Sequence, residues 1–292
     1  MSEGVSQPLA VDLGQRTRRP WNHLALVSAT ILAAYIVVAI IGPWISPYDP
    51  NELGVGPPLS PPTAEHWFGT DELGRDQLSR CISAVRVAMV VGFSSVGIAL
   101  VIGGCFGILA GYVRGKADTV TMRGMDVLFA FPELILAIIV IAALGPSAWT
   151  AVIAIAIVYI PRFARIARVS TLTVEGNAYI EAARIASLSP PRIVTRHVIP
   201  NIRASLIVMT ALCMSTAQLA YATLSFLGFG ARPPQADFGS MLAASRNFMT
   251  FDSWLVIFPG LSLVGLIVAF NLCGDAIRDA LDPHFGKEIS SG

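Results

Sequence analysis

The chain has 292 residues, of which 54% are apolar and only 13% are charged, and its formal net charge is +1. A soluble domain usually carries about twice that charged fraction, so the composition places the chain among membrane proteins. The near-neutral charge offers no bulk attraction to nucleic acid, and no nucleic-acid partner is expected.

Six apolar segments are long enough to cross a bilayer as helices, which predicts an all-α, polytopic membrane protein. The six predicted spans are residues 23–45, 87–113, 125–144, 149–164, 204–229 and 254–273. The fourth is short and contains Pro161 and Arg162, so a break is expected there. The first span runs into Gly42, Pro43 and Trp44 rather than a small-residue cleavage site, which favours an uncleaved anchor.

The distribution of arginine and lysine predicts the orientation of these spans. Most of the 20 basic residues lie on one side; the other side holds Arg75, Arg80, Arg232 and Arg246, with Arg86 at a boundary. Positive charge marks the cytoplasmic face, so both terminal segments, 1–22 and 275–292, are expected in the cytoplasm. Residues 165–203 are expected on the same face, within a core transmembrane domain of residues 87–274. Residues 46–86 and 231–253 then form external loops.

Local patterns add detail to this plan. Residues 46–62 contain six prolines, which favours an extended path, and a helix is expected to begin near Thr70 or Asp71. In the second span, Gly103, Gly107 and Gly111 lie on one helical face, which predicts close packing against another helix of the bundle.

A polar stretch separates the fourth and fifth spans, with the sequence YIEAARIASLSPPRIVTRHVIPN at residues 179–201. A first short helix is predicted over residues 178–186. A second begins after Ser189, with Pro190 at its first position, and ends at Pro200. Such a short helix pair would be marginal alone and is better explained by docking into a groove on a partner.

The frame of this stretch is Glu181-Ala182-Ala183, then Ser187 six residues after Glu181, then Pro200 thirteen residues later. It resembles the EAA loop of binding-protein-dependent ABC importer permeases, where glycine usually stands in place of Ser187. Four further segments resemble the second ("C") permease of the dipeptide/oligopeptide/nickel subfamily, over nearly the whole chain. They are HWFGTDELGRDQLSR (66–80), LSFLGFGARPP (224–234), FGSML (238–242) and NLCGDAIRDALDP (271–283). Tyr221 and Phe238 stand where relatives commonly carry glutamate and tryptophan, which points to substrate or receptor contacts there.

The resemblance implies a type I ABC importer permease fold in the cell membrane, in contact with lipid. The implied partners are a homologous second permease, two cytoplasmic ATPases and an external substrate-binding protein. ATP and magnesium would be held by the ATPases, and no cofactor by this chain. The implied cargo is di- or oligopeptides, with nickel or glutathione as alternatives within the same family.

Two groups of site residues follow from the resemblance. Coupling to the ATPases is implied for Glu181, Ala182, Ala183, Ser187, Arg192 and Pro200. An external gate or binding-protein contact is implied for Phe68, Gly69, Asp71, Arg75 and Asp76.

The chain has no GxxxxGK[ST] loop, no nucleophile–base–acid set and no metal-ligand spacing, so neither catalysis nor a metal site is expected. Glu133, near the inner end of the third span, is either a proton or cation site or an interfacial carboxylate paired with Arg123 or a neighbouring subunit. We favour the second interpretation. The first would suit a different class, an ion-coupled homodimeric carrier. After the sixth span, Asp275, Arg278 and Asp282 are expected to pair and order the helix end.

Overall fold

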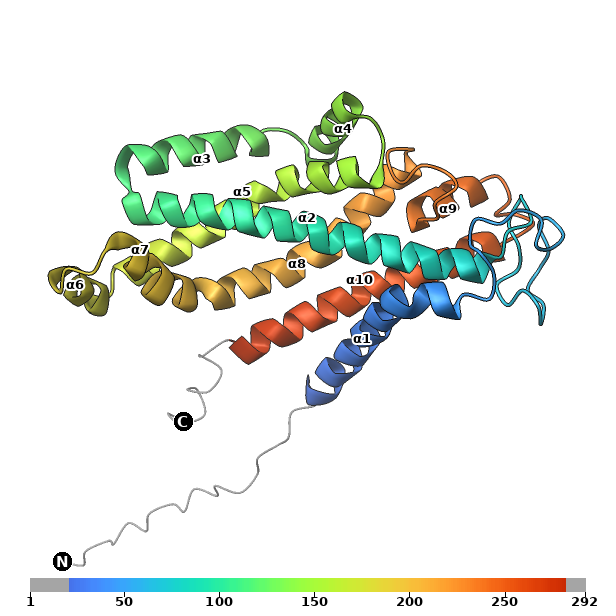
Figure 1. Cartoon of the computed structure of the whole chain (residues 1–292), viewed down its shortest axis with the longest axis horizontal. Helices are drawn as coiled ribbons and strands as arrows, with labels where there is room; N and C mark the ends of the chain where they lie inside the picture. Colours follow the sequence, from blue (N-terminus) through green and yellow to red (C-terminus); the bar gives the residue numbers. More distant parts are fainter. Residues whose placement is uncertain (1–20, 282–292) are drawn as a thin grey trace, which may run out of the picture.

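The computed structural model describes residues 21–281 of the chain, which contain helices and loops but no β-strand element. Figure 1 shows the arrangement. The elements are α1 (Trp21–Ile45), α2 (Gln77–Val113), α3 (Gly115–Phe129), α4 (Glu133–Leu144), α5 (Ala148–Glu175), α6 (Ala178–Ile185), α7 (Pro190–Ile193), the π-helical turn η1 (Val194–Val198), α8 (Ile199–Phe226), α9 (Phe238–Ser245) and α10 (Trp254–Leu281). By length and composition, five helical segments can cross a membrane, and the bent pair of α3 and α4 brings the number to six when it is counted as one span. The predicted all-α, six-span architecture is confirmed.

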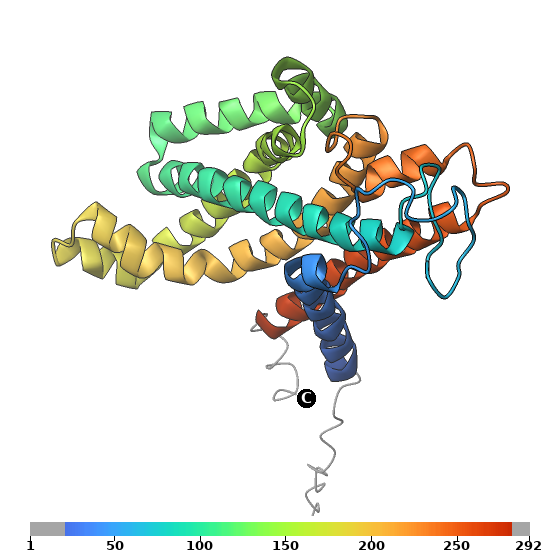
Figure 2. The same ribbon diagram turned by 45° about the vertical axis from the view of Figure 1, so that its right-hand side comes forward.

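Helices α2 and α5 lie side by side in the centre of the bundle and form its most extensive interface. Helices α8 and α10 pack beside them, and α1 lies across α10 and α2 (Figures 1 and 2). The hairpin of α6 and α7 projects at one end of the bundle, which we call the α6 end. Helix α9 and residues 46–76 cover the opposite end, which we call the α9 end.

The glycine face of α2 packs directly on α5. A methyl group added at Gly103 or Gly107 would collide with the backbone carbonyl oxygen of Ile160 or Ala164, respectively. At Gly111 it would lie 2.9 Å from Cβ of Thr171. Only residues without a side chain allow the two backbones this close, so the predicted packing role of the glycine face is confirmed.

Helix α2 begins later than predicted. Residues 70–76 form a turn in which Asp71 Oδ1 accepts from the backbone N–H of Leu73 at 2.9 Å and of Arg75 at 3.0 Å. Gly74 has a φ of +70°. The helix then starts at Gln77, where the Asp76 carboxylate caps the N–H of Ser79 at 2.8 Å. The predicted start near Thr70 or Asp71 is wrong because the aspartate side chain ties the backbone into a turn instead.

The third span is bent rather than straight. Helices α3 and α4 meet at 91° across residues 130–132. Pro132 stands immediately before α4, and a proline disfavours helical backbone in the residue before it, which ends α3 there. The span also begins at Gly115, ten residues earlier than the predicted start at 125.

The fourth span is longer than predicted and is not broken at Pro161. Helix α5 runs from Ala148 to Glu175 with Pro161 inside it. The missing backbone donor is tolerated because the helix is held along its length by the close contact with α2. The buried side chains of Tyr159 and Phe163 flank the proline and anchor it in the core.

Candidate functional site

The EAA segment, defined as residues 181–200, forms the α6 end of the molecule. Helix α6 covers residues 178–185, as predicted. A turn leads to α7, which has Ser189 at its N-cap position and Pro190 at its start. The second helix does not end at Pro200, however. Pro200 lies in the first turn of α8, and the π-helical turn η1 precedes it with the N–H of Ile199 bonded to Val194 O.

The continuity through Pro200 has a local explanation. Proline lacks the N–H that would bond to the preceding turn of an α-helix. A π-helical turn changes the bonding register just before that position, and such turns often mark functional sites. The EAA segment therefore continues without a loop into the long apolar helix α8.

Ser187 has a left-handed backbone, with a φ of +57°. The Ser187 N–H donates to Arg184 O at 2.9 Å, and the next N–H, of Leu188, donates to Ala183 O at 3.1 Å, which closes the end of α6. The structure thus has a backbone conformation that favours glycine at the position where the EAA loop usually carries it.

We expect Ser187→Gly to stabilise the EAA segment by about 0.5–1 kcal/mol, because the left-handed strain is relieved at a small entropic cost. Ser187→Val should have the opposite effect, since a β-branched side chain tolerates positive φ poorly. Hydrogen exchange of the α6 amides would measure both. Equal protection in the two variants would contradict this expectation.

The outer surface of the EAA segment carries exposed polar and apolar groups. Glu181, Ala182, Arg192 and Pro200 are exposed, and Ala183 is half-buried. Ile185 is 80% exposed, an unusual state for a large apolar side chain at the tip of a hairpin. Sequence analysis did not identify Ile185 as a site residue. The only available signal was its spacing of four residues from Glu181, which places both side chains on the same face of α6.

The inner surface of the segment is a small separate core. Ile180, Ile193 and Val198 are almost completely buried and pack with Val174 of α5 and Ile202 of α8. This cluster holds the hairpin against the ends of the two long helices. The apolar faces therefore fix the segment, and the exposed faces remain free for contact.

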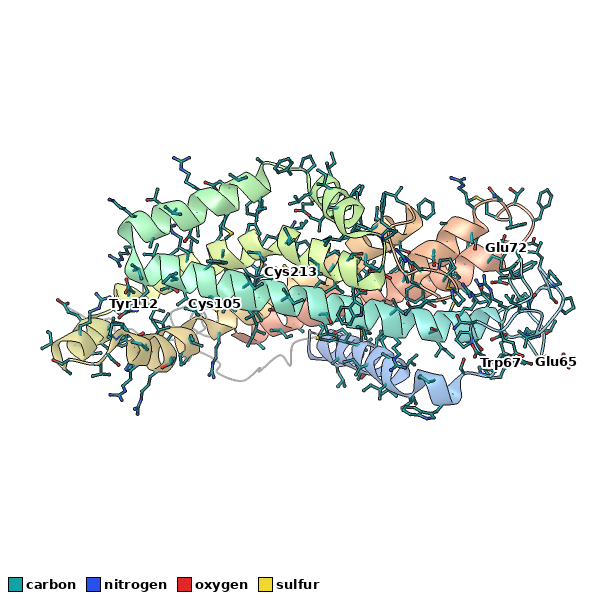
Figure 3. The ribbon with its side chains drawn as sticks, turned by 45° about the horizontal axis from the view of Figure 1, so that its top comes forward. Glu65, Trp67, Glu72, Cys105, Tyr112 and Cys213 are labelled. Atoms are coloured by element: carbon teal, nitrogen blue, oxygen red, sulfur yellow. The ribbon has the colours of Figure 1, made fainter. Side chains whose placement is uncertain are left out.

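Glu175, the last residue of α5, connects the EAA segment to the bundle. Its side chain is 1% exposed and lies between two arginines. Oε1 accepts from Arg184 of α6 at 2.5 Å, and Oε2 lies 3.0 Å from Arg114 at the corner between α2 and α3. The Arg184 guanidinium also lies 5.6 Å from the centre of the Tyr112 ring, whose position is labelled in Figure 3.

Sequence reasoning missed Glu175 and Arg114. They are 61 positions apart, and no periodic pattern links an acidic residue at the end of one helix to the corner of another. We call these three residues, Arg114, Glu175 and Arg184, the Glu175 clamp.

Three arginines along α5 bind acidic residues of the third span. Arg162 pairs with Glu133 of α4. Arg165 pairs with Asp126 of α3 at 2.7 Å, and Arg168 Nη2 donates to Asp118 Oδ2 at 2.6 Å. The prediction that Glu133 pairs with Arg123 is wrong, because the bend at residues 130–132 turns Glu133 toward α5.

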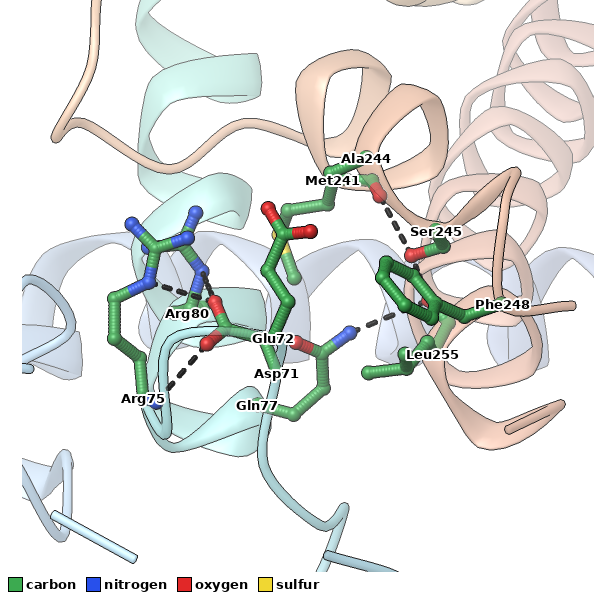
Figure 4. A pocket seen from close by; sticks show the side chains of 10 residues that line it. All are labelled: Asp71, Glu72, Arg75, Gln77, Arg80, Met241, Ala244, Ser245, Phe248 and Leu255. Atoms are coloured by element: carbon green, nitrogen blue, oxygen red, sulfur yellow. Dashed lines mark hydrogen bonds and ion pairs between the residues drawn. The ribbon is translucent and has the colours of Figure 1, made fainter. Parts of the chain in front are cut away.

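At the α9 end, Asp71 is the centre of a second charged group. Its Oδ2 atom lies 2.6 Å from Arg75 Nε and 3.5 Å from Arg80 Nε. Figure 4 shows how the three side chains lie. The small cavity beside them has a volume of about 20 Å³, which is room for a water molecule rather than a peptide. Gln77, at the edge of this cavity, donates to Leu255 O of α10 at 3.3 Å and so ties the segment to the bundle.

The other predicted contact residues of this segment are also engaged inside the fold. Asp76 accepts from Ser79 and lies 3.0 Å from His66 Nδ1. Phe68 stacks on Phe258 with ring centres 4.0 Å apart. The backbone of Gly69 has a φ of +75°. Residues 66–76 therefore form a folded cover, and its exposed apolar groups are Trp67 and Leu73.

Two further sequence expectations change with the structure. Tyr221 and Phe238 are only 3% and 2% exposed, so neither side chain offers a direct surface for substrate or receptor. Asp275 and Arg278 are exposed on α10, and no ion pair joins them in the described part of the chain. Asp282 lies outside the described residues.

Comparison with known proteins adds independent information. Residues 103–287 match a family model described as "Binding-protein-dependent transport system inner membrane component". Residues 21–62 match a second model, the N-terminal TM domain of oligopeptide transport permease C.

Similar proteins carry permease names. The chain is 41% identical to the probable D,D-dipeptide transport system permease protein DdpC of Escherichia coli (strain K12), over 92% of this chain and 90% of that one. It is 40% identical to the dipeptide transport system permease protein DppC of Alkalihalophilus pseudofirmus, over 90% and 86%. It is also 40% identical to the glutathione transport system permease protein GsiD of Escherichia coli O1:K1 / APEC, over 92% of each chain.

Solved structures share the fold. An inward-facing form of the MetNI methionine ABC transporter aligns with a TM-score of 0.59 at 18% identity, over 70% of this chain and 97% of that one. This similarity concerns the path of the backbone.

Proposed function

The chain belongs to the family of binding-protein-dependent transport system inner membrane components, and from this membership we propose that it is one of two permease subunits of an ATP-driven importer of short peptides. Relatives named for dipeptide transport, at about 40% identity over most of the chain, support peptide cargo. The glutathione permease relative keeps glutathione as the second candidate, and glutathione is itself a short peptide with free carboxylates.

In this proposal the EAA segment is the contact with the ATPases. The observation that carries it is the exposed face of α6, on which Glu181 and Ile185 stand one turn apart on a hairpin with its own buried core. Closure of two ATPases, which hold the ATP and magnesium, would push this hairpin, and its contacts with α5 and its continuity with α8 would carry the movement into the membrane. A homologous permease completes the pathway, and an external binding protein delivers the cargo.

The proposed orientation places the α6 end in the cytoplasm. The EAA segment and α5 together carry six of the chain's 20 basic residues, a cluster expected for a cytoplasmic face. The α9 end then faces the exterior and the binding protein. Glu133 is paired with Arg162, which leaves less reason to regard it as the proton site of an ion-coupled carrier.

We expect the complete complex in lipid vesicles to import a dipeptide only when ATP, the ATPases and the binding protein are present. Glu181→Arg should weaken copurification of the ATPases by about tenfold or more, since a reversed charge at the centre of a docking surface costs roughly 1.4 kcal/mol or more. Glu52→Arg, an exposed reversal at the α9 end, is the matched control. Uptake by this chain without ATPases would refute the proposal.

A further inference from the structure

A cavity at the α9 end is lined by arginines without any acidic residue, unlike the rest of that end. It has a volume of about 520 Å³ and lies between residues 83–91 of α2, the start of α5 and the loop that follows α8. Arg86 of α2 and Arg232 of the loop both line it, and its lining contains no carboxylate. In contrast, the arginines at 75 and 80 are already bound to Asp71.

Neither arginine of the cavity has an acidic partner. Arg232 Nε donates to Pro146 O at 2.7 Å, which fixes its guanidinium over the turn between α4 and α5. No ion pair joins Arg86 or Arg232 to any acidic residue in the range 21–281. Arg86 also borders a neighbouring cavity lined by Asp49 and Glu52, but it has no ion pair with either. Arg86 stands at the boundary of the second span and Arg232 in the loop after α8, and arginines without an acidic partner that border a cavity can bind a carboxylate there.

The start of α5 adds a third source of positive potential. Ser147 caps this 28-residue helix by accepting from the N–H of Thr150 at 3.1 Å, and Ser147 and Ala148 line the cavity. The first N–H groups of a helix lack partners within it and favour anions. Two guanidinium groups and a helix start therefore converge on one space.

The remaining walls fit the rest of a peptide. Val87 and Val152 are apolar, and Trp149, which is 65% exposed, offers an aromatic face. Gln235 supplies an amide that can donate to and accept from a peptide bond. We propose that this cavity binds the C-terminal carboxylate of the transported peptide, with Arg86 and Arg232 as its ligands; this rests on the proposed peptide transport.

The test uses chemical modification rather than uptake, in the complete complex in lipid vesicles. In a Val90→Cys variant, whose cysteine lines the cavity at a position with no role in the proposed binding, a thiosulfonate reagent modifies position 90. The rate is read by peptide mass spectrometry, which separates this position from the native cysteines. We expect a dipeptide at about 1 mM to slow this rate by roughly twofold or more, as for a site of millimolar affinity. The same dipeptide with a C-terminal amide should not slow it.

Arg86→Gln together with Arg232→Gln should abolish the protection, whereas Arg246→Gln, an arginine outside the cavity at the same end, should preserve it. The proposal would be overturned if the dipeptide and its C-terminal amide protected the cysteine equally. It would also be overturned if the dipeptide gave no protection at about 10 mM. The proposal would also be overturned if anionic lipid in the vesicle, and not the dipeptide, slowed modification of the introduced cysteine. That result would identify a lipid phosphate as the occupant of the cavity. ATP-driven dipeptide uptake is measured in parallel, so that failure of this site is distinguished from failure of the proposed function.

Discussion

Glu175→Gln should lower ATP-driven uptake by roughly tenfold while the transporter still assembles, because it weakens the attachment of the EAA segment to the bundle. The Glu175 carboxylate is almost completely buried and joins two arginines from different helices. Hydrogen bonds to charged groups contribute about 1.5–3 kcal/mol each. The cost of removing the Glu175 charge is smaller than this sum, because Arg114 and Arg184 are about half exposed and water can hydrate their guanidinium groups. We therefore expect α6 to lose about 1–2 kcal/mol of attachment.

The measurement that isolates this effect is the ratio of peptide imported to ATP hydrolysed. A loosened EAA segment would let the ATPases turn over without moving the membrane helices, so the ratio should fall while ATP hydrolysis persists. Hydrogen exchange should show faster opening of α6, and Glu175→Asp should restore part of the ratio. Asp126→Asn is the matched control, because it removes a carboxylate from an arginine pair on α5 far from α6. An unchanged ratio in Glu175→Gln would show that the clamp is not part of the coupling.

Gly107→Ala should destabilise the permease strongly. A methyl group there would collide with the carbonyl oxygen of Ala164, and backbone cannot move aside as a side chain can. Overpacking of this kind costs about 1–3 kcal/mol, and separation of the two central helices would put the cost at the upper end. A loss of that size lowers the melting temperature of a domain this large by about 5–10 °C.

Gly104→Ala is the matched control for this prediction. Gly104 is buried in the same helix turn, but a methyl group there would meet nothing within 4 Å. It should be neutral or stabilise α2 by about 0.5–1 kcal/mol, because alanine is the better helix former. Thermal melting of the two variants in the same detergent would decide the matter. Similar melting temperatures would mean that the α2–α5 contact is less tight than the structure has it.

The sequence by itself determined the membrane class, the number of spans and the packing role of Gly103, Gly107 and Gly111. These follow from the hydrophobicity and spacing of neighbouring residues, which need no knowledge of the remainder of the chain. It also determined the EAA segment and the first of its helices, because the segment closes its own turns with local hydrogen bonds.

Only the tertiary structure decided where helices continue and which charges meet. Pro161 lies inside α5 because the close contact with α2 holds the helix together, whereas Pro132, next to a bend, ends α3. The partners of Asp118 and Asp126 are 50 and 39 residues away in the chain, and Glu175 finds Arg114 across the end of the bundle. Residues so far apart in sequence are brought together by the packing of whole helices, and no local pattern contains that information.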